Sequence, residues 1–171
     1  MTVTILSDDE IMPYEQRVME AINKHEGVKA AELIKNGTAE DLFKPDTKNL
    51  SKKTALHYAI IEGYTENALA LINKEGVTAE KLFQQEDRLK YTPLHEAIVK
   101  KNRIVALALI NKDGITIEQL SLKNKFGQSA ANLANENHMQ DVVVAIESKI
   151  NSIKRFKQPT LTINRSQGRF L

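Results

Sequence analysis

The chain has 171 residues, of which 42 % are apolar, and it contains no cysteine. This length suffices for one ordinary hydrophobic core, and the lack of cysteine excludes a disulfide framework and a cysteine-ligated metal site. The first ten residues lack the basic and apolar regions of a signal peptide, so we expect no cleaved leader. No apolar run approaches the roughly 18 residues that a membrane helix needs, which predicts a soluble, cytoplasmic protein.

The net charge of +2 is unevenly distributed along the chain. Residues 1–147 hold 18 of the 24 Lys and Arg residues and all 22 Asp and Glu residues, which gives this part a charge of −4. Residues 148–171 hold the remaining six basic residues and no acid, which gives them +6. Such a split indicates a tail that docks on an acidic partner or one that folds back on the body.

The chain begins with an unrepeated lead-in over residues 1–12, followed by Pro13. A helix is predicted at roughly residues 14–24, because its apolar residues recur at helical spacing. A second helix follows Gly27 and ends at Gly37. This is the pattern of two antiparallel helices joined by a short connection.

A six-residue pattern then recurs along the chain. Thr92 begins Thr-Pro-Leu-His-Glu-Ala, and Thr54 begins Thr-Ala-Leu-His-Tyr-Ala 38 residues earlier. Thr suits the N-cap of a helix, and Pro suits the first helical position because it has no amide hydrogen to leave unpaired there. Weaker copies begin at Ser129, 37 residues after Thr92, and around Val18. Four copies predict four helix–turn–helix units, the outer two degenerate as end caps that face water should be.

The pattern Thr-Pro-Leu-His-x-Ala at the head of a helix pair resembles the signature of the ankyrin-repeat family. The resemblance implies an all-α solenoid over residues 1–150, followed by a basic tail over residues 151–171. It also implies that His57 and His95 are structural, each bonding back to its own turn and to the neighbouring repeat. The expected repeats lie at approximately 14–51, 52–89, 90–126 and 127–150.

The period of 37–38 residues exceeds the usual 33, and the extra residues follow each second helix. There the chain repeats a Thr, an acid two residues later, and a Leu, in the segments 38–42, 78–82 and 116–120. Thr at an N-cap with acids in the first turn favours a helix. We therefore predict one extra helical turn in each connection, with Leu and the following Phe packed against the stack. An irregular loop whose apolar residues fill the groove is the alternative.

A turn leads from each connection into the next repeat, and here the family favours Asp-x-x-Gly-x-Thr. The last copy runs from Asn124 to Ser129 and has Gly127 at the Gly position. The inner copies have Lys52 and Lys90 there. Because Gly relieves a positive φ, the Lys residues leave the hairpin geometry of these two turns open.

The repeat pattern ends at Ile150. A helix can continue to Gln158, and Pro159 would stop it. Residues 160–164 alternate like a short strand, and residues 166–168 have the composition of a turn.

Motifs of enzymatic chemistry do not occur in the sequence. We find no Gly-rich phosphate loop, no His-Glu-x-x-His and no Gly-x-Ser-x-Gly. We therefore predict no enzymatic activity, no cofactor and no metal site.

The resemblance implies a protein–protein interaction module that binds its partner on the concave face, formed by first helices and turns. Among the family's variable positions, Tyr58 and Tyr91 are the expected anchors, because aromatic residues dominate binding hot spots. Transferred residue by residue, these positions are Lys52, Lys53, Tyr58, Ile61, Glu62, Lys90, Tyr91, Glu96, Val99, Lys100 and Lys101.

Two alternatives remain open at this point. The basic tail could grip nucleic acid or an anionic membrane electrostatically, or the chain could be a purely structural domain of an assembly. The Lys-, Asn- and Ile-rich composition is typical of an AT-rich bacterial genome, and the long period is similar to that of ankyrin proteins of intracellular bacteria. This similarity implies an effector that acts on host proteins, in which case the relevant compartment is the host cytoplasm.

Overall fold

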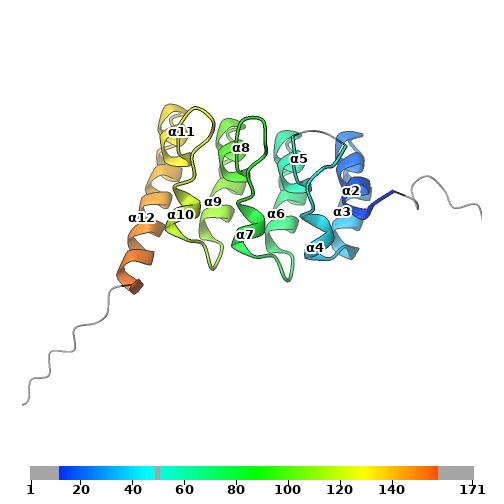
Figure 1. Cartoon of the computed structure of the whole chain (residues 1–171), viewed down its shortest axis with the longest axis horizontal. Helices are drawn as coiled ribbons and strands as arrows, with labels where there is room; N and C mark the ends of the chain where they lie inside the picture. Colours follow the sequence, from blue (N-terminus) through cyan, green and yellow to red (C-terminus); the bar gives the residue numbers. More distant parts are fainter. Residues whose placement is uncertain (1–11, 49–50, 158–171) are drawn as a thin grey trace, which may run out of the picture.

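The computed structural model describes residues 12–48 and 51–157, which form four helix pairs stacked in a row (Figure 1). No strand occurs within these two ranges, and the predicted all-α architecture of four helix pairs is confirmed. The first helices of the pairs are α2 (Tyr14–Asn23), α5 (Ala55–Ile61), α8 (Pro93–Val99) and α11 (Ala130–Glu136). The second helices are α3 (Gly27–Asn36), α6 (Thr65–Asn73), α9 (Arg103–Asn111) and α12 (Gln140–Lys157).

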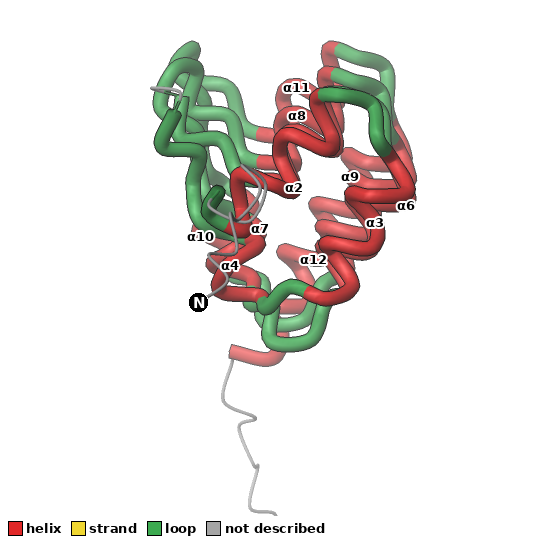
Figure 2. Tube along the Cα trace, turned by 90° about the vertical axis from the view of Figure 1, so that its right-hand side faces the viewer, coloured by secondary structure: helices red, strands yellow, loops and turns green. Residues whose placement is uncertain are grey.

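The helices form two rows. Helix α2 packs on α5, α5 on α8 and α8 on α11, while α3, α6, α9 and α12 pack on one another in the same order. Seen end-on, the first helices lie between the second helices on one side and the connections on the other (Figure 2). Side chains at equivalent positions therefore meet from repeat to repeat.

The core repeats with the period of the sequence. Positions 38 residues apart carry the same side chain, and each is fully buried between neighbouring repeats. Removing such a side chain from water stabilises the fold by about 1.5–3 kcal/mol. In the first helices these residues are Ile22, Ile60 and Ile98, and in the second helices they are Ile34, Ile72 and Ile110.

The predicted extra turns are short helices, α4 (Ala39–Leu42), α7 (Ala79–Leu82) and α10 (Ile117–Leu120). Each begins at a Thr N-cap; for example, the Thr116 hydroxyl accepts a hydrogen bond of 3.2 Å from the Gln119 amide. Each Leu is buried, and so are Phe43 and Phe83, which directly follow α4 and α7. The prediction of one extra helical turn in each connection is thus confirmed, and the alternative of an irregular loop is wrong.

After each short helix the chain turns back on itself, and we call these segments the three fingers: residues 46–48 with 51–53, residues 86–91, and residues 123–129. Each finger is closed by a backbone hydrogen bond, from Asp46 to Lys53 (2.7 Å), from Glu86 to Tyr91 (2.9 Å) and from Asn124 to Gln128 (2.9 Å). The fingers are also joined to one another. The Asp87 amide donates to the Ser51 carbonyl at 2.7 Å, and the Lys125 amide donates to the Leu89 carbonyl at 2.8 Å.

The fingers keep the left-handed turn despite the missing glycines. Lys52 has φ 52° and Lys90 has φ 57°, close to the 78° of Gly127. The two turns with Lys at the Gly position therefore keep the hairpin geometry of the family. The bonds that close each finger and join it to its neighbour hold the Lys backbone in a conformation that L-residues disfavour.

Gly127→Ala is expected to lower the free energy of unfolding by about 1 kcal/mol, because only the left-handed φ opposes the substitution. A Cβ at this position would meet no atom within 4 Å, so no clash contributes. Chemical denaturation measures the loss. Gly127→Asn is the matched control, since Asn tolerates this conformation, and its loss should be smaller. Equal losses in the two variants would contradict the explanation.

Helix α12 passes the predicted domain boundary at residue 150 and continues to Lys157. Its Ile153 is partly buried and packs against the core. We therefore propose that the repeat domain extends to the end of α12. The strand and turn predicted between residues 160 and 168 lie outside the described residues. In the described part of the chain, no helix is long and apolar enough to cross a membrane.

Candidate protein-binding face

The two repeated histidines have the structural role that the resemblance implies. His57 is fully buried, and its Nδ1 lies 2.9 Å from the Thr54 hydroxyl and accepts from the Thr54 amide at 3.2 Å. Its Nε2 lies 3.3 Å from the Tyr91 carbonyl in the next finger. Because a carbonyl only accepts, Nε2 must carry the proton. His57 thus ties its own helix cap to the neighbouring repeat.

His95 repeats this arrangement one unit later. Its Nδ1 lies 2.8 Å from the Thr92 hydroxyl, and its Nε2 donates to the Gln128 carbonyl at 3.3 Å. Burial lowers the pKa of both rings, in His57 to about 4, so both are neutral at pH 7. With both nitrogens occupied, neither ring has a lone pair to offer a metal ion. Among the residues that the structure describes, no group of His, Asp or Glu could hold one.

We call the side of the stack formed by the fingers and the first helices the finger–helix face. The eleven predicted partner-binding residues come from two fingers, from α5 and α8, and from the turns after these helices. Six are exposed: Lys52, Glu62, Lys90, Val99, Lys100 and Lys101. Four are half-buried, namely Lys53, Tyr58, Ile61 and Tyr91, whereas Glu96 is buried.

Both predicted tyrosine anchors also make contacts within the protein. The Tyr58 hydroxyl donates to Asp46 Oδ2 at 2.7 Å, which links α5 to the first finger. The Tyr91 ring stacks on His95 with a centroid distance of 5.8 Å. A partner can therefore reach only part of each ring, and removing either ring also removes an internal contact.

Glu96 differs from the other ten predicted residues because the residue is only 7 % exposed. Burial raises the pKa of its carboxyl group, and the nearby Lys53 ammonium opposes that rise. The two groups are 3.8 Å apart, so Glu96 holds Lys53 over α8. Glu96 therefore affects the face indirectly, by fixing the position of the Lys53 ammonium group.

Sequence reasoning missed the residues that anchor the fingers. In the first finger, the Asp46 carboxylate accepts hydrogen bonds from the Lys48 amide and the Gln16 side chain. In the second, the Glu86 carboxylate accepts from the amides of Arg88, Leu89 and Tyr91. In the third, the Asn124 side chain accepts from the amides of Phe126 and Gln128. All three are buried. In the second finger Glu86 has this role rather than Asp87, because the bond that closes this finger joins residues five positions apart, Glu86 and Tyr91, whereas in the third finger Asn124 and Gln128 are four positions apart. An acid or amide five to eight residues before each Thr or Ser cap was the available signal.

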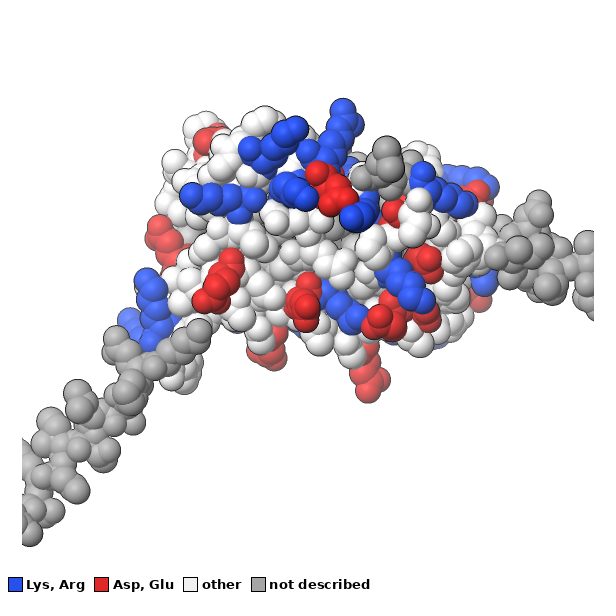
Figure 3. Space-filling view, viewed as in Figure 1, with Lys and Arg blue, Asp and Glu red and all other residues white. Residues whose placement is uncertain are grey.

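Sequence reasoning also missed the concentration of positive charge on the fingers. Lys and Arg side chains gather over this part of the surface, while acidic side chains are more frequent over α4, α7 and α10 (Figure 3). The exposed basic residues of the fingers are Lys48, Lys52, Arg88, Lys90, Lys123 and Lys125. Phe126, at the tip of the third finger, is 66 % exposed.

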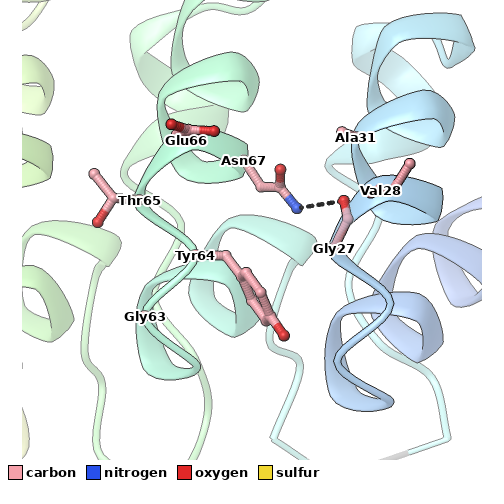
Figure 4. A pocket seen from close by; sticks show the side chains of 8 residues that line it. All are labelled: Gly27, Val28, Ala31, Gly63, Tyr64, Thr65, Glu66 and Asn67. Carbon is pink, nitrogen blue, oxygen red and sulfur yellow. Dashed lines mark hydrogen bonds between the residues drawn. The ribbon is translucent and has the colours of Figure 1, made fainter.

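The opposite side of the stack carries an open hollow of about 620 Å³ between α3 and α6 (Figure 4). Gly27 and Gly63 leave room there, and Tyr64 and Val28 supply apolar surface. A Cβ at Gly27 would lie 3.3 Å from the Tyr64 ring, so this glycine permits the close approach of the two repeats. The only charged lining residue is Glu66, and the hollow contains no arrangement of catalytic groups.

Comparison with known proteins agrees with this geometry. The family model described as ankyrin repeats (3 copies) matches residues 18–121. The chain therefore belongs to the ankyrin-repeat family. No curated protein sequence matches it.

Among solved structures, the fold is similar to a chain in the crystal structure of the yeast ribosomal protein Rps3 in complex with its chaperone Yar1. The TM-score is 0.61 at 19 % sequence identity, over 85 % of this chain and 97 % of that chain. At this identity the similarity supports the ankyrin fold alone. Family and fold together define the protein as a protein–protein interaction module.

Proposed function

We propose that the chain binds a protein partner on the finger–helix face, the concave face of the ankyrin family. The observation that carries the proposal is the continuity of this face across repeats. Lys53 of the first finger reaches Glu96 on α8, and Tyr58 on α5 reaches Asp46 in the first finger. Fingers and first helices are thereby held in one rigid surface, which lowers the entropy lost on binding.

The composition of the face also supports binding. It combines two tyrosine rings with exposed charge and with Val99, whose side chain is 40 % exposed. Interfaces favour such aromatic anchors surrounded by a polar rim. Among the described residues, the second helices expose Val28 and Ile104 and, near the end of α12, Phe156, whose charged sequence neighbours Lys154 and Arg155 are basic only.

The double variant Tyr58→Ala/Tyr91→Ala is expected to weaken partner binding by about 2 kcal/mol or more, roughly 30-fold in Kd, as truncation of anchors does. A partner captured by the intact chain from bacterial and host lysates, then titrated by calorimetry, provides the measurement. The source of that partner also tests the hypothesis of a bacterial effector.

Two controls separate binding from folding. Tyr58→Phe removes only the hydroxyl bonded to Asp46 and keeps the ring, so its effect on binding should be small. Val28→Ala/Ile104→Ala removes two exposed side chains from the second helices and should leave binding unchanged.

Deletion of residues 158–171 combined with Lys154→Gln/Arg155→Gln/Lys157→Gln removes all five basic residues of the tail and tests it as the alternative site. Unlike a cut at residue 150, this deletion leaves α12 complete, including Ile153. Binding that survives the tyrosine changes but disappears with the tail, and falls steeply as salt rises, would place the site on the tail.

A further inference from the structure

The second and third fingers combine unpaired positive charge with an exposed aromatic ring. Lys52 and Lys90 share Asp87, at 3.0 and 3.3 Å, so their charges are partly neutralised. By contrast, Arg88, Lys123 and Lys125 form no ion pair with any described residue. All three are exposed, as is Phe126 at 66 %.

These side chains are held on a fixed backbone. The Lys125 amide donates to the Leu89 carbonyl, which joins the two fingers at 2.8 Å. Gln85 Nε2 donates to the carbonyls of Lys90 (2.7 Å) and Lys123 (2.8 Å), which joins them a second time. Asn124 holds the third fingertip by accepting from the Phe126 amide at 2.9 Å. The charges and the ring therefore share one preorganised surface.

We propose that this surface binds an acidic segment of a protein partner, with Arg88, Lys123 and Lys125 contacting carboxylates and Phe126 covering an apolar side chain. The assignment rests on the proposed function of the finger–helix face and specifies the chemistry of its partner. Three cations without acidic partners attract an anionic segment. The exposed Phe beside them adds affinity when the partner covers its ring and removes it from water.

The same surface suits nucleic acid less well. Single-stranded nucleic acid is bound by successive bases that stack on successive aromatic rings. Here Phe126 is the exposed ring, because Tyr91, the nearest aromatic residue of the second finger, is half-buried and stacked on His95.

Fluorescence anisotropy on the full chain tests the proposal, with a labelled peptide of glutamates around one central phenylalanine as probe. Lys123→Glu/Lys125→Glu is expected to weaken binding about tenfold at low salt, and this difference should shrink as salt screens the charges. Phe126→Ala is expected to weaken binding about tenfold as well, but with little dependence on salt.

The matched controls are variants with the same kinds of substitution in other parts of the molecule. Lys35→Glu/Lys154→Glu alters the net charge equally on α3 and α12, and Ile104→Ala removes a 62 % exposed side chain from α9. Both should bind the probe like the unmodified chain, and so should a chain without residues 158–171.

Four outcomes would overturn the proposal: no binding of the peptide, equal weakening by the charge control, loss of binding only on tail removal, or tighter binding of an oligothymidine. Because the tyrosine experiment uses the captured partner, the two proposals fail separately. Loss of partner binding in the tyrosine variant together with no peptide binding would reject only the acidic assignment.

Discussion

Phe83→Ala is expected to lower the free energy of unfolding by about 3–5 kcal/mol, the cost of removing a large aromatic side chain from a packed core. Phe83 directly follows the short helix α7, and only 4 % of its side chain is exposed. It belongs to the buried hydrophobic core beneath the second connection. Urea denaturation followed by circular dichroism measures the change.

The third connection supplies the matched control. Ser121 occupies the position of Phe83 after α10, and it is exposed. Ser121→Ala should therefore change stability by less than about 0.5 kcal/mol, as surface substitutions do. A similarly small effect at Phe83 would show that the short helices lie on the stack without stabilising it.

The short helices also show why so much of the fold could be predicted. Thr38, Thr78 and Thr116 combine an N-cap with acids in the following turn, and this signal is local. The helix pairs could be predicted equally well, because the apolar residues Ile22, Ile60 and Ile98 recur at a fixed period. Where cap, period and apolar pattern agree, no knowledge of distant contacts is required.

The fingers could not be predicted in the same way, because their conformation depends on contacts between residues far apart in the chain. Lys90 has a left-handed φ in a turn that Glu86 caps from inside and that is bonded to the neighbouring finger. A positive φ at Lys opposes the local preference, so single-residue reasoning points the other way. Tertiary hydrogen bonds outweigh this preference.

The candidate face was predictable in position and less so in exposure. Family positions placed the eleven residues on the fingers, on the first helices and in the turns after them, but the burial of Glu96 follows from its place on α8 beside Lys53 rather than from its residue type. For Phe126 the difference runs the other way: an aromatic residue is usually expected in the core, but here it is exposed. Its fingertip position, two residues after Asn124, is what exposes it.

The buried His57 is expected to make stability depend on pH between about 7 and 4. Its pKa is 6.5 when exposed in the unfolded chain and about 4 in the folded protein, because burial disfavours the charged ring. In this window the unfolded state binds the proton more tightly. Stability is therefore fully present above pH 6.5 and is lost as pH falls towards 4, by about 3 kcal/mol in total.

Other groups near the ring titrate in the same range and must be separated from it. His57 faces Lys53 and Glu86, and the lowered pKa of His95 acts in the same direction. Glu96 acts in the opposite direction: its raised pKa favours the folded state at low pH, and this contribution is lost as pH rises. The pH profile of the unmodified chain is thus a sum of opposing contributions.

His57→Asn isolates the histidine, because the fourth repeat already shows Asn in this role. Asn132 Oδ1 accepts from the Ser129 amide at 3.1 Å and from the Ser129 hydroxyl at 2.8 Å, as His57 Nδ1 does with Thr54. The variant retains this cap without a titrating ring. The difference in unfolding free energy between the unmodified chain and the variant should then fall by about 3 kcal/mol from pH 7 to pH 4. A difference that stays constant over this range would show that the folded protein binds a proton at His57 as readily as the unfolded chain, and that the ring is not held neutral between the two repeats.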